Sequence, residues 1–193
     1  MSAYPIQLTV KLTDVELMLG LKSGDHEFLE PILRRHRLPV TQFIYRHVHN
    51  AAIAEELAQE VFFSIYRARH RYEPSANFTT WLYRIAKNRA MNWVRDNRHT
   101  RNQSSLDLVV LKKAGPLSTP EQQLLRGAYL KGIRDAVDAL PDRQRNAVLM
   151  HKFSGLGYAE IASIMECPVT TVKALINRAY SSLRKSLADG VHN

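Results

Sequence analysis

The sequence lacks the features from which disulfide-rich, zinc-binding and membrane proteins are recognised. Its 193 residues include one cysteine, Cys167, which has no partner for an internal disulfide, and no Cys and His cluster has zinc-site spacing. No apolar run approaches the roughly 18 residues of a membrane span, and residues 1–12 do not resemble a signal peptide. We therefore expect a cytoplasmic protein with no metal, no cofactor and no membrane insertion.

Strand signals are also scarce. Alternating apolar and polar residues and Asn-Gly or Asp-Gly turns are missing, whereas helix-capping signals and helical spacing recur along the chain. Thr13 and Glu16 have capping-box spacing, and Pro120 stands where proline opens a helix. The expected fold is all-α. Within the apolar pattern of 25–50, Pro31 and Pro39 are expected to kink or split the helix.

A polar stretch separates two helical parts of the chain. Helical periodicity stops near residue 98 and resumes at residue 119, and the residues between are rich in Asn, Gln, Ser, Gly and Pro. This composition is typical of a flexible linker. We therefore expect two small helical domains, at 1–100 and 119–193, joined by a linker at 101–118.

Acidic residues are outnumbered. The 27 Lys and Arg residues against 18 Asp and Glu residues give a formal charge of +9. Such an excess favours a polyanionic partner, with nucleic acid first and an anionic membrane surface second.

The stretch from Tyr158 to Tyr180 has the layout of a helix-turn-helix. A short apolar helix, a turn at Glu166 to Pro168 and a second helix follow one another. The second helix of such a motif lies in the major groove, so its outward polar side chains can contact phosphates and base edges. These candidates are Thr170, Thr171, Lys173, Asn177 and Arg178. An ordinary helical hairpin explains the periodicity equally well, but seven basic residues against three acidic ones in 141–187 favour DNA binding.

A second basic stretch, 81–103, carries six Lys and Arg residues against one Asp, with Trp and Tyr residues interleaved. Basic residues follow a phosphate backbone, and exposed rings can stack on unpaired bases, so this stretch suggests the handling of opened DNA. For Phe78, Trp81 and Trp93, a place in the core is the favoured alternative.

An acidic helix start precedes this basic stretch. Glu55, Glu56 and Glu60 lie at the beginning of an amphipathic helix expected over 51–71. The helix dipole explains carboxylates at this position, and a surface for docking another protein is the alternative, because an acidic patch repels DNA.

Taken together, three stretches resemble the extracytoplasmic-function (ECF) sigma factors of the sigma-70 family. Residues 54–68 (AEELAQEVFFSIYRA) resemble region 2.2 of that family and residues 78–95 (FTTWLYRIAKNRAMNWVR) resemble regions 2.3 to 2.4. Residues 140–187, which begin LPDRQRNAVLMHKF, resemble region 4. The resemblance implies a transcription initiation factor, not an enzyme, that directs the RNA polymerase core to promoters.

The resemblance also implies roles for individual residues. Glu56, Gln59 and Glu60 match the motif that docks on the polymerase β′ subunit. The loop at 72–78 would hold an everted base of the minus-ten element, with Tyr72, Asn77 and Phe78 as its candidates. Asn88, with Arg84 and Lys87 nearby, would face the upstream duplex. The helix from residue 169 to 180 would read the minus-thirty-five element. The partners implied are the β′ and β subunits of the polymerase core, promoter DNA and an anti-sigma factor.

Three departures from the family pattern affect these expectations. Glu166 replaces the usual Gly of the turn, so the turn must form without a residue that readily takes positive φ. Ala174 and Leu175 stand where Ser and Arg are frequent, which removes one candidate contact to the minus-thirty-five element. Glu56 stands where Asp is usual.

Two other classes of function are open to a basic helical protein. A helix-turn-helix repressor or activator would bind its operator without polymerase, but it leaves the acidic helix and the basic aromatic helix unexplained. A nuclease or recombinase would need a nucleophile or a carboxylate cluster for metal ions, and the sequence shows no such constellation.

Overall fold

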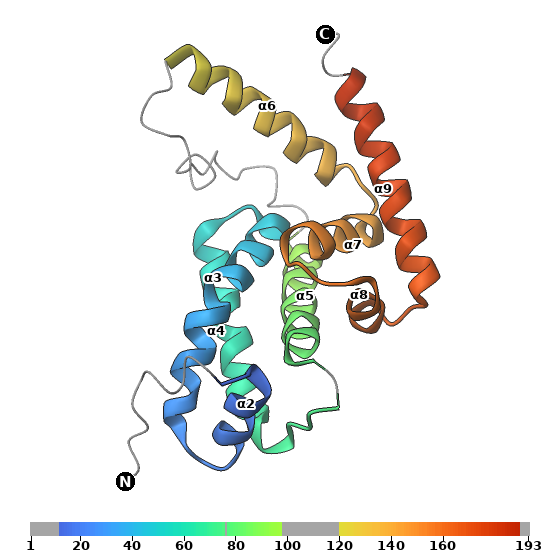
Figure 1. Cartoon of the computed structure of the whole chain (residues 1–193). Helices are drawn as coiled ribbons and strands as arrows, with labels where there is room; N and C mark the ends of the chain where they lie inside the picture. The colour runs from blue at the N-terminus through green and yellow to red at the C-terminus, as the bar shows by residue number, and fades with distance from the viewer. Residues whose placement is uncertain (1–11, 76, 98–119, 190–193) are drawn as a thin grey trace. The chain divides into compact units, whose positions relative to one another are not determined.

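The structure is a computed structural model that describes residues 12–75, 77–97 and 120–189. Within these ranges every regular element is a helix (Figure 1), as the sequence predicts. In chain order they are α2 (Asp14–Lys22), the 3-10 helix η1 (His26–Phe28), α3 (Leu29–Val48), α4 (Ala51–Ala68), the 3-10 helix η2 (Arg69–Arg71), α5 (Phe78–Asp96), α6 (Pro120–Asp138), α7 (Asp142–Phe153), α8 (Tyr158–Met165) and α9 (Val169–Asp189).

The chain forms two compact units, and the main division falls between residues 104 and 105. The N-terminal unit contains α2 to α5 and the C-terminal unit contains α6, α7 and α9. The linker expected at 101–118 lies outside the described residues, so its predicted flexibility stays a prediction.

Helix α2 begins with the capping box that the sequence predicts. The Glu16 backbone N–H donates to Thr13 Oγ1 over 3.3 Å, and Glu16 Oε2 accepts from the Thr13 backbone N–H over 2.7 Å. The hydrogen bonds that the Thr13 backbone N–H and hydroxyl donate to this carboxylate hold the pKa of Glu16 below its usual value. The helix ends at Lys22, and Gly24 then takes a φ of 103°, which a residue with a Cβ adopts only with strain.

The core of the N-terminal unit lies among α3, α4 and α5. Each of these helices is amphipathic, and its apolar stripe is buried against the other two. Large side chains that are almost completely buried include Phe43, Ile44, Val61, Ile65 and Leu82. Burying each such side chain stabilises the fold by about 1.5–3 kcal/mol.

The two prolines of α3 do not split it, contrary to one of the two outcomes that we expected. Pro31 lies in the first turn, where its missing N–H would have no acceptor within the helix. Pro39 lies inside the helix, which continues to Val48. Buried side chains on both sides of Pro39, such as Ile32 and Phe43, offset the loss of one backbone hydrogen bond.

The C-terminal unit packs α9 against α6 and α7. Leu140, Val148 and Ala179 form a buried cluster on which Leu183 also packs. The helix start that the sequence predicts at Pro120 is confirmed, since Pro120 is the first residue of α6. The turn between α8 and α9 and the start of α9 also lie where the helix-turn-helix pattern predicts.

Candidate nucleic-acid and protein interfaces

Helix α9 presents the predicted DNA-contacting residues on its outer face. Val172, Ile176 and Ala179 are buried, so the opposite side of the helix is turned to solvent. Of the five sequence-predicted residues, Thr170, Lys173, Asn177 and Arg178 are exposed and Thr171 is half-buried. Thr170, Lys173 and Asn177 are three or four residues apart and form one row along the helix, and Thr171 and Arg178, which are seven residues apart, lie beside that row. The structure therefore brings all five to one face of α9.

Two aromatic residues that the sequence reasoning missed support Lys173. Its ammonium nitrogen lies 5.9 Å from the ring centroid of Tyr158, the first residue of α8. The His151 ring in turn stacks on the Tyr158 ring, with centroids 4.9 Å apart and an angle of 21° between the planes. The cation–π contact keeps the Lys173 side chain near α8. No periodicity signals such a contact, because Tyr158 and Lys173 belong to different helices.

The turn before α9 is made by Glu166 in the left-handed conformation. Its φ is 52° and its ψ is 52°, a region that non-glycine residues occupy at a cost of roughly 1 kcal/mol. The next backbone N–H, that of Cys167, donates to the Ala162 carbonyl oxygen over 3.1 Å and closes the end of α8. The turn therefore forms with Glu166 in place of glycine, at the expense of backbone strain.

Arg145 contributes to the fold of the C-terminal unit, although the sequence reasoning counted it among the basic residues that favour DNA binding. Only 3% of the residue is exposed. Its Nη2 lies 2.6 Å from Asp142 Oδ1, and its Nη1 donates to the Asp138 carbonyl oxygen over 3.2 Å. This guanidinium joins the end of α6 to the start of α7, so it is not available to a phosphate.

The two aromatic residues predicted at the minus-ten loop are buried. Tyr72 is 4% exposed and Phe78 is 2% exposed, and both rings pack near Trp81 at 5.4 Å and 6.1 Å between centroids. Burial, reinforced by the negative charge of Asp14, raises the pKa of Tyr72 above its ordinary value. Phe78 therefore lies in the core, as the favoured alternative predicted for it, whereas Trp81 is half-buried.

The polar residues predicted near this loop lie on or beside α5. Asn77 and Asn88 are exposed, and Arg84 and Lys87 are half-buried. Arg84 and Asn88 are four residues apart and share one side of the helix. Arg98 and Arg101, which belong to the same basic stretch, lie outside the described residues.

Arg89 points to a different side of α5 from Arg84 and Asn88. Its Nη1 lies 3.1 Å from Glu60 Oε2, and its Nη2 donates to Ser64 Oγ over 3.3 Å, both on α4. Arg89 therefore ties α4 to α5, and Glu60 is one half of an ion pair rather than an isolated carboxylate.

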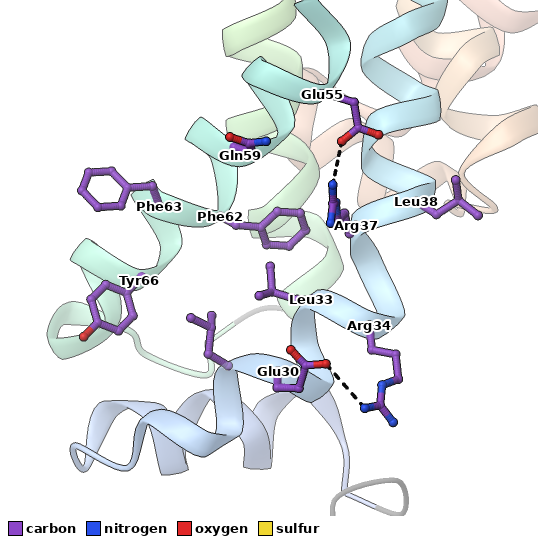
Figure 2. Close-up of a pocket in the computed structure, with 11 residues that line it drawn as sticks. Glu30, Leu33, Arg34, Arg37, Leu38, Glu55, Gln59, Phe62, Phe63 and Tyr66 are labelled. Carbon is purple, nitrogen blue, oxygen red and sulfur yellow. Dashed lines mark hydrogen bonds and ion pairs between the residues drawn. The ribbon is translucent and has the colours of Figure 1, made fainter. Parts of the chain in front are cut away.

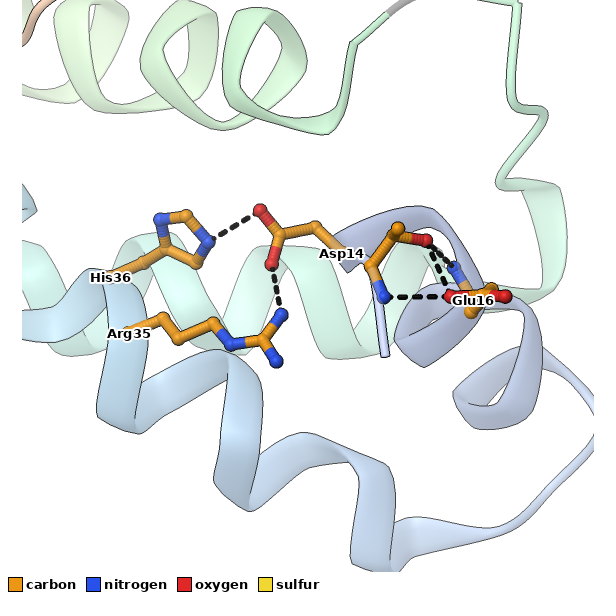
Figure 3. Close-up of polar contacts among 5 residues, drawn as sticks. Asp14, Glu16, Arg35 and His36 are labelled. Atoms are coloured by element: carbon orange, nitrogen blue, oxygen red, sulfur yellow. Dashed lines mark hydrogen bonds and ion pairs between the residues drawn. The ribbon is translucent and has the colours of Figure 1, made fainter. Parts of the chain in front are cut away.

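Helix α2 contacts the start of the predicted minus-ten loop directly and is linked to its end through α3, which the sequence reasoning missed. The ammonium group of Lys22 donates to the Tyr72 carbonyl oxygen over 2.8 Å. At the other end of α2, Asp14 Oδ1 lies 3.0 Å from Arg35 Nη1 and its Oδ2 lies 2.8 Å from His36 Nε2 (Figure 3). The Asp14 and Lys22 contacts join residues 21 to 50 positions apart, so no local pattern signals them.

One of the predicted protein-docking residues lies on a groove between α3 and α4. Glu56 and Gln59 are exposed. Gln59 lines the groove, which has a volume of about 900 Å³ (Figure 2). Its walls carry two exposed apolar side chains, Leu38 and Phe63, at 64% and 60% exposure. They also carry the ion pair between Arg37 Nη2 and Glu55 Oε2, at 3.1 Å.

The pair Phe62 and Phe63 is the sequence signal that could have revealed this groove. Adjacent residues on a helix point in different directions, so two consecutive aromatic rings cannot both join the same buried stripe. Phe62 is 5% exposed and Phe63 is 60% exposed. An apolar ring left in solvent beside an acidic helix start indicates a surface for a protein partner.

Two classes of site are missing from the described residues. No helix among the described residues is both long enough and apolar enough to cross a bilayer. Among the same residues, no three His, Cys, Asp or Glu side chains come together as metal ligands would.

Comparison with known families identifies both halves of the chain. Residues 32–100 match sigma-70 region 2, and residues 130–183 match sigma-70 region 4. The RNA polymerase sigma-H factor of Pseudomonas aeruginosa is 31% identical over 180 residues, which cover 90% of this chain and 93% of that protein. The ECF RNA polymerase sigma-E factor of Escherichia coli K12 is 30% identical over 182 residues, 91% of this chain and 95% of the relative.

Two solved structures share the fold. CnrH, in complex with the cytosolic domain of CnrY, superposes with a TM-score of 0.69 at 19% identity, covering 91% of this chain and 97% of CnrH. The sigma factor RpoE of Bartonella quintana, in complex with the anti-sigma factor NepR, gives a TM-score of 0.64 at 21% identity. That match covers 82% of this chain and 96% of RpoE.

Proposed function

Since the chain belongs to the sigma-70 family, as an ECF RNA polymerase sigma factor, we propose that it binds the polymerase core in the cytoplasm and directs it to promoters through two separate DNA-contacting surfaces. The protein acts by binding and catalyses no reaction of its own. The observation that carries this proposal is the row of exposed polar residues on α9, backed by a buried apolar stripe, in a chain whose two halves match sigma regions 2 and 4.

The docking surface for the polymerase is proposed to be the start of α4 together with the groove beside it. Glu56 has no hydrogen bond or ion pair with the other described residues, so its carboxylate is available to a basic partner. Gln59 and Phe63 add a polar and an apolar contact within two turns of the same helix. Exposed apolar area beside a free charge is the composition of a specific protein interface. The partner proposed for it is the β′ subunit, with β as the second contact of the holoenzyme.

The surface for the minus-ten element is proposed to be the loop at 72–78 and the adjoining side of α5. Because Tyr72 and Phe78 are buried, we assign them to the floor of the loop and Asn77 to its exposed rim. Arg84, Lys87 and Asn88 would then contact the duplex next to the opened bases. Basic and amide side chains on one helix suit contacts to phosphates and base edges.

The surface for the minus-thirty-five element is proposed to be the outer row of α9. Asn177 and Arg178 can form hydrogen bonds with base edges in the major groove, and Thr170 and Thr171 lie at the helix start, where phosphates are favoured. Lys173 would contact the backbone or a guanine. Each good base contact contributes about 1–3 kcal/mol of discrimination.

An anti-sigma factor is the regulatory partner that we propose. CnrH and RpoE were each solved in complex with another protein, CnrY and the anti-sigma factor NepR. In this chain the groove beside α4 offers a regulator the same apolar surface that the polymerase needs. Competition for that surface would keep the factor inactive.

Run-off transcription with purified core polymerase tests the proposal. Genomic fragments transcribed with core enzyme plus this protein should give products from defined start sites, while the protein alone should bind the same fragments weakly. Core enzyme without the protein is the control. Tight operator binding without polymerase, combined with no defined initiation, would contradict the proposal and favour the helix-turn-helix repressor or activator.

A further inference from the structure

We propose that α2 is a clamp that holds both ends of the minus-ten loop in the shape that receives an unpaired promoter base. Lys22 and Asp14 are then positioning residues for base capture. This inference rests on the proposed function of the loop and extends it to a helix that lies outside the residues matched by sigma-70 region 2.

The first contact of the clamp is at the beginning of the loop. Lys22 is half-buried, and its ammonium group donates to the backbone carbonyl of Tyr72 over 2.8 Å. Tyr72 ends the 3-10 helix η2, and its own N–H donates to the Arg69 carbonyl over 3.2 Å. A charge-assisted hydrogen bond to the carbonyl fixes the peptide plane at which the chain leaves η2. The direction in which the loop starts therefore depends on α2.

The second contact reaches the end of the loop indirectly, through α3. Asp14 bridges Arg35 and His36, two neighbouring residues of α3, with one carboxylate oxygen each (Figure 3). The His36 ring packs against the ring of Phe78, the first residue of α5, with centroids 5.3 Å apart. Because His36 has only 13% of its side chain exposed, the carboxylate of Asp14 sets the ring orientation that Phe78 contacts.

Anchoring and positioning are separate tasks within α2. Leu17, Met18 and Leu21 are completely buried and hold the helix to the unit. Thr13 and Glu16 close its first turn. The polar groups of Asp14 and Lys22 take no part in that apolar contact, so a change at either should leave α2 in place and alter the loop.

Fixing the loop in advance favours base capture, because the cost of ordering the loop is then met on folding and not on binding. A loop that is held only at one end would have to be ordered each time a base enters it. Removing one charge-assisted hydrogen bond should therefore weaken capture by about tenfold.

The test measures the affinity of holoenzyme for fork-junction DNA taken from a promoter found by run-off transcription. A series of templates carries one abasic site at each position of the minus-ten element. Wild-type holoenzyme should lose affinity at the position whose base enters the loop. Lys22→Met should bind the intact template about tenfold more weakly and lose its sensitivity to that abasic site. Asp14→Asn should show the same pattern, and Lys22→Arg, which keeps a charged donor, should restore most of the sensitivity.

The controls separate positioning from stability and from the proposed function. Lys131→Met removes one exposed positive charge from α6 and should change neither affinity nor abasic sensitivity. Core binding of Lys22→Met and Asp14→Asn should match the wild type, and their thermal unfolding should stay cooperative with a midpoint lowered by only a few degrees. If the wild type is sensitive and both variants keep full sensitivity, the clamp is wrong and the proposed function stands. If the wild type is insensitive at every position, the base-capture assignment is wrong and the clamp with it.

Discussion

The two units of the molecule differ in which of their polar side chains are paired with other helices and which are left exposed. In the N-terminal unit, ion pairs join the helices near the surface: Asp14 with Arg35 and His36, Arg37 with Glu55, and Arg89 with Glu60. In the C-terminal unit, the guanidinium of Arg145 is buried, and α9 leaves Asn177 and Arg178 exposed. Neither of these two side chains has a hydrogen bond or ion pair with the described residues.

This difference fits two kinds of DNA recognition. Reading a duplex through the major groove needs side chains that are free to meet base edges, on a helix held rigidly from behind. Capturing a base from opened DNA needs a loop of fixed shape, and the ion pairs of the N-terminal unit fix the elements on both sides of that loop. The exposed side chains of α9 thus suit contact with a duplex, and the ion pairs between the helices of the N-terminal unit suit the placement of the loop.

The largest expected effect is on the stability of the C-terminal unit, when the buried Arg145 side chain is removed. Arg145→Ala should lower the free energy of unfolding of the C-terminal unit by about 2–3 kcal/mol, because it removes a buried side chain whose hydrogen bonds join α6 to α7. Thermal unfolding followed by circular dichroism measures the loss, and hydrogen exchange of α6 and α7 amides locates it. Arg143→Ala, at an exposed position two residues away, is the matched control and should change stability by less than about 0.5 kcal/mol. Equal stability of Arg145→Ala and the wild type would contradict the structural role.

Two acidic residues of the N-terminal unit differ in the same way: Glu60 is paired with Arg89, whereas Glu56 has no ion pair with the described residues. Glu56→Arg should weaken binding to core polymerase by at least about tenfold, since it places a like charge against a basic partner. The measurement is the affinity of labelled protein for core enzyme at two salt concentrations. Glu27→Arg, an exposed acid in η1, is the charge-matched control. Unchanged core binding by Glu56→Arg would remove the docking assignment.

Local features of this fold could be predicted from the sequence, and contacts between helices could not. The capping box at Thr13 and the start of α6 at Pro120 depend on residues within one turn, and both lie where the sequence predicts. The contact of Lys22 with Tyr72 joins residues 50 positions apart and depends on how α2 packs on the unit. The burial of Arg145 is likewise invisible to a count of charges, because a count does not distinguish surface from interior.

In the candidate site, too, the local pattern could be predicted and the contacts between helices could not. The helical period alone places Asn177 and Arg178 on the outer side of α9, since Val172 and Ile176 must face inward. The sequence could not decide whether Phe78 stacks on a base or supports the loop, because both roles need an aromatic ring. Packing against His36 and Trp81 decides where that ring lies.

Glu166 gives the smallest expected effect and tests the strain in the turn of the C-terminal unit. Glu166→Gly should raise the free energy of unfolding by about 0.5–1 kcal/mol, because glycine adopts a φ of 52° without the Cβ clash. Thermal unfolding measures the change. Glu166→Ala keeps the Cβ and removes the rest of the side chain, so it should not stabilise the protein. A loss of stability in Glu166→Gly would contradict the assignment of strain.

The most direct test of the central claim crosses protein variants with promoter variants. Run-off transcription with Arg178→Ala and with Asn88→Ala is measured on templates that carry single base-pair changes in either promoter element. Arg178→Ala should lose about tenfold of its discrimination in the minus-thirty-five element and none in the minus-ten element, and Asn88→Ala should do the reverse. If both variants alter discrimination at the same element, or each alters both equally, the two units do not read separate stretches of the promoter.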